Sequence, residues 1–133
     1  MAKLTDIRII ASKLFFLPIE TRVPLKFGTE TLTHVTCART QLTVRLSNGN
    51  IAKGWGETPL SVQWVWPSPS SYNARHKALK DFCVYLSKAW VEFDSVGHPI
   101  EISYDFQQKN YLVCLMNLTD HKLQENPCHG LLH

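Results

Sequence analysis

Apolar and polar residues alternate through residues 4–17, a pattern typical of a half-buried β-strand. Ile7 and Ile9 occupy the apolar positions first, and Leu14 and Phe16 occupy them in the opposite phase. An extra residue in a strand moves the side chains that follow to the other face of the sheet, so a change of phase indicates a β-bulge. We therefore predict a first strand that contains one bulge.

Residues 18–33 interrupt this alternation. The segment contains Pro18, Pro24 and Gly28 and has little periodicity. At about 16 residues it is longer than most connections in a compact domain, and ordered loops of this length are often functional. The pattern predicts a long ordered loop.

A β-hairpin is predicted on either side of Asn48 and Gly49. Apolar and polar residues alternate from Leu42 to Leu46, and residues 51–58 form the partner strand. Both residues of an Asn-Gly pair tolerate positive φ, which favours a type I′ turn between two antiparallel strands.

A long helix is predicted after a segment rich in proline and serine. Ser71 is a candidate N-cap, because its hydroxyl can accept a hydrogen bond from an amide of the first turn. Apolar residues then recur at steps of three and four and form one wide stripe: Ala78, Leu79, Phe82, Cys83, Leu86, Ala89, Trp90 and Phe93. The stripe predicts about six turns at 3.6 residues per turn, and Gly97, His98 and Pro99 end it.

A second, less regular helical pattern extends from Ile102 to Leu118. The order of strand, hairpin, helix and helix predicts an α+β fold. In this fold a three-stranded antiparallel meander sheet is followed by a helical bundle of two or more helices.

The composition is that of one globular domain. Of the 133 residues, 44% are hydrophobic and 19% are charged, which is enough to bury a core. The net charge of +3 is spread along the chain, so no nucleic-acid partner is expected. Arg8 and Lys13 interrupt the N-terminal apolar run, and no segment reaches the roughly 18–20 apolar residues of a membrane span. We therefore expect no membrane partner and a cytoplasmic location.

The four cysteines Cys37, Cys83, Cys114 and Cys128 are widely spaced and include no C-x-x-C pair. Without a secretory signal, this spacing favours reduced thiols over a disulfide framework.

Several short segments resemble one known family. They are Pro24, Leu25, residues 27–30, the alternating strand from residue 42 to 46, and Gly54-Trp55-Gly56-Glu57 at the end of the hairpin. In their order along the chain, these segments resemble the N-terminal capping domain of the mandelate racemase and muconate lactonizing enzyme family, in the enolase superfamily. The resemblance covers residues 4–106.

The resemblance implies a division of the chain. Residues 1–106 would form the capping domain, and residues 107–133 would form a divergent, partly helical tail. In the family, a (β/α)₈ barrel of about 250 residues supplies the Mg²⁺ ligands and the bases of racemases, cycloisomerases and dehydratases. A chain of 133 residues has no room for that barrel. We therefore expect a truncated, isomerase-like member with no catalytic residue and no cofactor of its own.

The resemblance also implies which residues set substrate specificity. In the family, two loops of the capping domain close the active site, and they correspond here to residues 18–33 and 58–67. The specificity residues implied in this way are Lys26, Phe27, Thr29, Glu57, Val62, Trp64 and Trp66. A lid that excludes water strengthens the electrostatic interactions beneath it.

Two hypotheses follow for these residues. A capping domain without its barrel would leave apolar surface exposed. We therefore expect this surface to form a homo-oligomer, most simply a dimer, or to bind a barrel domain in trans. The alternative is a small stand-alone binding module, in which Phe27, Trp64 and Trp66 line a pocket for a hydrophobic ligand or peptide.

Two residues have both a chemical and a structural interpretation. Glu57 could act as an acid or base, or it could accept hydrogen bonds that fix a turn. Trp55 could be a stacking platform, or it could pack against the helix stripe.

The histidines are interpreted more simply. His121, Cys128, His129 and His133 lack the spacing of a zinc site, so no metal site is predicted. His34, His76 and His98 are interpreted as surface or cap histidines.

Overall fold

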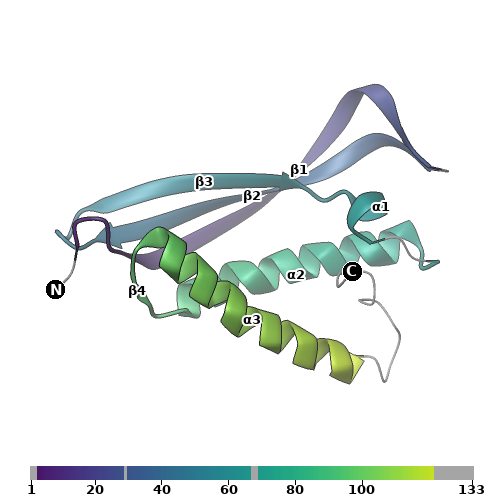
Figure 1. Cartoon of the computed structure of the whole chain (residues 1–133). Helices are drawn as coiled ribbons and strands as arrows, with labels where there is room; N and C mark the ends of the chain where they lie inside the picture. The colour runs from purple at the N-terminus through teal and green to yellow at the C-terminus, as the bar shows by residue number, and fades with distance from the viewer. Residues whose placement is uncertain (1–2, 29, 67–68, 122–133) are drawn as a thin grey trace.

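The computed structural model describes residues 3–28, 30–66 and 69–121, and for Phe27 and residues 111–121 it describes the backbone alone. The elements in chain order are β1 (Ile7–Phe27), β2 (Glu30–Leu46), β3 (Ile51–Pro59), α1 (Val62–Val65), α2 (Tyr72–Glu92), β4 (Val96–Gly97) and α3 (Pro99–His121). The strands form one antiparallel sheet in the order β3-β2-β1-β4. The helices α2 and α3 lie on one side of this sheet (Figure 1).

The predicted bulge in the first strand is confirmed. Ile9 pairs with Val44 and Ala11 pairs with Thr43, so Ile10 is an extra residue on β1. The insertion reverses the phase of the side chains that follow, as the sequence pattern indicated.

Polar contacts and a buried cluster identify the face of the sheet that α2 covers. Ser12 on β1 shares a 2.7 Å hydrogen bond with Ser87, and Thr36 on β2 shares a 3.0 Å hydrogen bond with His76. Ala38, Leu60, Val62 and Leu79 form the buried cluster, and Leu14, Phe16, Val65, Tyr72 and Cys83 pack against it.

The prediction of a loop at residues 18–33 is wrong, because β1 continues to Phe27 and β2 begins at Glu30. We call this two-stranded end, residues 18–28 and 30–33, the hairpin arm. It extends beyond the rest of the sheet at the upper right of Figure 1.

Pairing to a single neighbour explains why prolines are tolerated in the hairpin arm. β4 pairs with β1 only at Ile7 and Arg8, so in the described part of the chain the rest of β1 is an edge strand. An edge strand tolerates proline because its outward N–H groups are not needed by a neighbour. A larger irregularity between Glu20 and Leu25 further hides the periodicity, since four residues of β1 there face one residue of β2.

The hairpin at Asn48 and Gly49 is confirmed, but its turn type differs from the prediction. Gly49 has a φ of 86°, whereas no non-glycine residue in the described part of the chain has a positive φ. The Gly49 amide donates to the Leu46 carbonyl at 2.9 Å, and the Leu46 amide donates to the Asn50 carbonyl at 2.8 Å. This geometry is a type I turn followed by a glycine bulge, in which only the glycine needs the left-handed conformation.

The predicted long helix and its cap are confirmed by α2. The Ser71 hydroxyl accepts a hydrogen bond from the Ala74 amide at 3.3 Å, and the helix runs for 21 residues. The second predicted helix is α3, which continues through residue 106 without a break. Phe106 stacks on Trp90 of α2 with ring centroids 3.7 Å apart, so aromatic packing joins the two helices.

The sheet has four strands, not the predicted three. β4 consists of Val96 and Gly97 and pairs with the start of β1. Two residues are too few to show an alternation, so the sequence pattern could not reveal this strand.

Candidate functional site at the hairpin arm and helix α1

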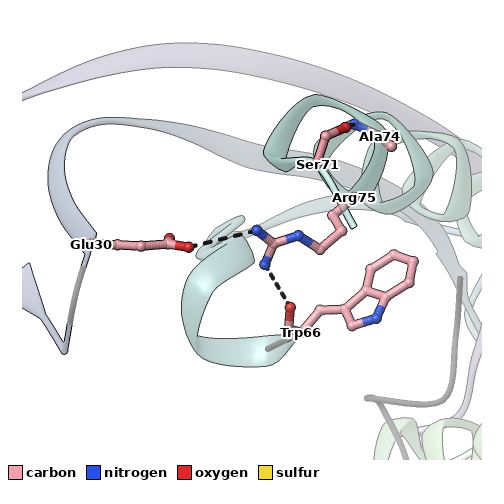
Figure 2. A network of polar contacts seen from close by, with 5 residues as sticks. All are labelled: Glu30, Trp66, Ser71, Ala74 and Arg75. Atoms are coloured by element: carbon pink, nitrogen blue, oxygen red, sulfur yellow. Dashed lines mark hydrogen bonds and ion pairs between the residues drawn. The ribbon is translucent and has the colours of Figure 1, made fainter. Parts of the chain in front are cut away.

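A buried arginine joins the two segments that the sequence identified as specificity loops. Arg75, near the start of α2, is 4% exposed. Its Nη1 donates a hydrogen bond to the Trp66 carbonyl at 2.7 Å, and its Nη2 lies 3.7 Å from Glu30 Oε1. Figure 2 shows the guanidinium group between these two oxygens. Because Glu30 begins β2 and Trp66 follows α1, Arg75 holds the hairpin arm and α1 together.

Sequence reasoning did not identify Arg75. The one available signal was the position of this arginine near the N-terminus of a predicted helix. The helix dipole repels a positive charge there, so the guanidinium group needs stabilising partners. The first turn of α2 contains no acidic residue that could supply one. Both partners come instead from other elements of the fold.

Helix α1 places its two ends in the core and its middle on the surface. It has four residues, and the Trp66 amide donates to the Val62 carbonyl at 3.0 Å. Residues four apart lie on the same side of a helix. Val62 and Trp66 are accordingly 0% and 3% exposed, whereas Trp64 is 73% exposed.

The structure separates the specificity residues that the resemblance implies. Val62 and Trp66 belong to the core, so Trp64 and Trp66 do not share one surface. Lys26 is exposed on the hairpin arm. The side chain of Phe27 and the whole of Thr29 lie outside the described residues.

Glu57 lies away from the hairpin arm. Its Oε2 is 2.6 Å from the Nε of Arg39, the residue that pairs with it across β2 and β3. The carboxylate therefore fixes a cross-strand pair rather than a turn.

Trp55 is on the same sheet face as Glu57. Its ring centroid is 6.0 Å from that of Phe15, and its side chain is 59% exposed. Trp55 shares a face with Glu57, because residues two apart on a strand point to the same side. Phe15 and Glu57 both pair with Arg39, so Phe15 lies on this face too. Both aromatic rings are therefore on the face of the sheet that α2 does not cover. The interpretation that Trp55 packs against the helix stripe is therefore wrong.

The hairpin arm carries exposed apolar side chains. Ile19, Val23 and Leu25 are 40%, 69% and 51% exposed. We refer to these three side chains, together with the exposed Trp64 of α1, as the arm surface. Exposed apolar side chains of this kind are candidates for contact with a partner.

His76 is not a simple surface histidine. It is partly buried, its Nε2 shares the hydrogen bond with Thr36, and its ring stacks on Tyr72 with centroids 5.6 Å apart. Burial lowers the pKa of His76 from its ordinary value of 6.5, and the nearby Lys80 lowers this pKa further. His98 is a cap histidine as predicted, because its Nδ1 accepts a hydrogen bond from the Ile100 amide at 3.3 Å.

The lowered pKa of His76 predicts that the domain loses stability in mild acid. Below the ordinary pKa of 6.5, the unfolded chain binds a proton that folded His76 binds only at lower pH. The contribution of neutral His76 to the stability of the fold is therefore complete above pH 6.5, and it is lost as the pH falls through the lower pKa that His76 has in the folded chain. We expect urea unfolding at about pH 7.5 and about pH 5 to show the decrease, and His76→Gln to reduce it. An unchanged pH dependence in His76→Gln would contradict the prediction.

Of the four cysteines predicted to be reduced, Cys37 and Cys83 are free thiols, whereas the side chain of Cys114 and the whole of Cys128 lie outside the described residues. Burial raises the pKa of the Cys37 thiol, and the nearby Glu57 carboxylate raises this pKa further. Burial also raises the pKa of the Cys83 thiol. A raised pKa keeps a thiol protonated at neutral pH, so neither group is an activated nucleophile.

Among the residues with described side chains, no three His, Cys, Asp or Glu residues are grouped so that they could hold a metal ion. The tail side chains His121, Cys128, His129 and His133 lie outside that set. Within the described chain, no helix has both the length and the apolar character that crossing a bilayer requires.

The fold and the site define an α+β domain with a four-stranded antiparallel sheet and an apolar arm surface at one end. Comparison of the chain with protein-family models, curated proteins and solved structures gave no match.

Proposed function

We propose that this chain is a capping domain without catalytic residues of its own. In this proposal, the hairpin arm and α1 close over a binding site on a second domain, as in the mandelate racemase and muconate lactonizing enzyme family. The observation that carries the proposal is the position of Arg75, which ties the two candidate lid segments into one unit. A lid made of two segments can close as one body only if something joins them.

The exposed apolar side chains support a partner on this surface. Val23 and Leu25 are more than half exposed, although Leu25 pairs with Leu32 and Val23 lies in the bulge just before it. Full burial of such a side chain is worth about 1.5–3 kcal/mol, so a partner that covers the arm surface would gain binding energy. The contacts of Arg75 with Trp66 and Glu30 limit the loss of entropy when the lid closes, because the two segments already lie together.

The chemistry would come from the second domain. In the family, Mg²⁺ and the proton-transferring groups belong to the barrel, and the cap excludes water and contacts the distal part of the substrate. The residues of this chain that would form the lid are the exposed side chains of the arm surface. A barrel supplied by another polypeptide would complete the site in trans.

The proposal is tested by supplying barrels. Purified chain is mixed with (β/α)₈ barrel domains of this family from which the native caps have been deleted. We expect a one-to-one complex with at least one barrel and partial recovery of its Mg²⁺-dependent turnover. The double variant Val23→Asp/Leu25→Asp should weaken this complex by at least about tenfold.

Val91→Asp serves as the matched control, because Val91 is also an exposed valine, 42% exposed on α2, but lies outside the arm surface. It should leave the complex unchanged. Equal binding by wild type and Val23→Asp/Leu25→Asp, or failure to bind any barrel, would overturn the proposal. Turnover of a carboxylate substrate by the chain with Mg²⁺ and no second polypeptide would also overturn it.

A further inference from the structure

Strand β3 is exposed along its whole length. All nine of its residues are exposed, and it forms one edge of the sheet. A Cβ placed on Gly54 or Gly56 would meet no described atom within 4 Å, so α2 does not cover the helix side of this strand. A long, uncovered edge strand is a template for pairing with another strand.

The hydrogen bonds at the two ends of β3 show which backbone groups point outward. The Leu46 amide donates to the Asn50 carbonyl, and the Leu60 amide donates to the Thr36 carbonyl, both at 2.8 Å. The register between these bonds is unbroken, so even-numbered positions bond to β2. Odd-numbered positions therefore direct their N–H and C=O groups to the free edge, except that proline has no N–H: Ile51, Lys53, Trp55, Glu57 and Pro59.

We propose that β3 pairs antiparallel with β3 of a second copy of this chain, about a two-fold axis at Trp55. In this register Lys53 lies opposite Glu57 of the second copy, and Glu57 lies opposite Lys53 of the second copy. Trp55 lies opposite its own counterpart. The outward backbone groups of all three positions then bond across the interface, and the two sheets become one continuous sheet.

The charges select this register over its neighbours. An axis at Lys53 or at Glu57 places two like charges directly opposite each other, which is destabilising. An axis at Gly54 places Lys53 opposite Trp55, and an axis at Gly56 places it opposite Pro59. In neither case does the lysine face a carboxylate. Only the axis at Trp55 forms two opposite-charge pairs, so the edge is complementary to itself, and the occupant that fits it is a second copy.

The existing contacts of these side chains are compatible with the pairing. Glu57 uses Oε2 for its contact with Arg39, and the carboxylate can accept further hydrogen bonds from a lysine. Trp55 and Phe15 lie on the same face as the charged pair, so the second copy would extend this aromatic row across the interface. The arm surface is not part of the proposed contact.

Charge reversal tests the proposal in solution. Sedimentation equilibrium of the wild-type chain should show a dimer with a dissociation constant below about 1 mM. Lys53→Glu alone places glutamates opposite Glu57, and Glu57→Lys alone places lysines opposite Lys53. Each variant should associate at least about tenfold more weakly than wild type. An equimolar mixture of the two should form a heterodimer of near wild-type affinity, since every facing pair is then of opposite charge.

Arg39→Gln is the control for the loss of the internal ion pair in Glu57→Lys. It removes the same contact with Glu57 but leaves both proposed intermolecular pairs, so its association should equal that of wild type. A wild-type chain that stays monomeric would overturn the proposal. It would also be overturned by a dimer that both charge variants leave intact, or by a mixture that associates no better than its components.

Discussion

Replacing Trp66 by alanine is expected to lower the free energy of unfolding by about 3–5 kcal/mol, as for other large buried aromatic residues. The side chain is 3% exposed and lies one helical turn from Val62, which is fully buried. Its loss would leave a cavity at the junction of α1 with the core, and the surroundings can collapse only in part. Denaturant unfolding followed by circular dichroism measures the difference.

Trp64→Ala is the matched comparison, because it removes the same side chain two residues away. Trp64 is 73% exposed, so its replacement should change the free energy of unfolding by about 1 kcal/mol or less. It should instead weaken binding of a barrel domain if the arm surface forms the lid. Equal destabilisation by the two substitutions would contradict the arrangement of α1 described above.

Replacing Arg75 by alanine is expected to lower the free energy of unfolding by about 2–4 kcal/mol. A hydrogen bond from a charged group contributes about 1.5–3 kcal/mol, and the buried Trp66 carbonyl would lose its donor. The aliphatic part of the side chain would also leave a gap beside the core. Arg75→Lys should retain part of this stability, since an ammonium group cannot contact Trp66 and Glu30 with the same fork geometry.

The effect of Arg75→Ala should include the hairpin arm. Amide hydrogen exchange in residues 18–28 and 30–33 should increase, because the arm loses its contact with α2. Arg39→Ala is the control: its ion pair is exposed, so the substitution should cost less than about 1 kcal/mol. Glu30→Gln should also have a small effect, since Glu30 is 45% exposed. Similar losses in Arg75→Ala and Arg39→Ala would contradict a bridging role for Arg75.

Both predictions concern the same unit. Val62 and Trp66 anchor α1 in the core, and Arg75 connects the end of α1 to the start of β2. The core side chains therefore support the position of the arm surface without taking part in it. If the domain is a cap, substitutions of the anchoring residues should affect stability first, and substitutions of the arm surface should affect binding first.

The sequence by itself determined the elements whose signals are local. The change of phase between Ile9 and Leu14 identified a bulge, because side-chain alternation has a period of two and depends only on neighbouring residues. Ser71 identified the start of α2, because its hydroxyl bonds to an amide within the same turn. The Asn48-Gly49 hairpin could be located for the same reason, although its turn type could not.

Only the tertiary structure decided the features that depend on contacts between distant residues. Whether residues 18–33 form a loop or a strand pair depends on the pairing of β1 with β2 in this region, which continues on both sides of a register shift between Glu20 and Leu25. The sequence does not distinguish Trp64 from Trp66. Because α1 packs against the cluster that contains Leu79, Trp64 is exposed to solvent and Trp66 is buried. Arg75 acquires its role only because Glu30 and Trp66, remote in sequence, arrive at the same helix end. Local sequence patterns do not predict these tertiary contacts, because the contacts form only when whole elements pack together.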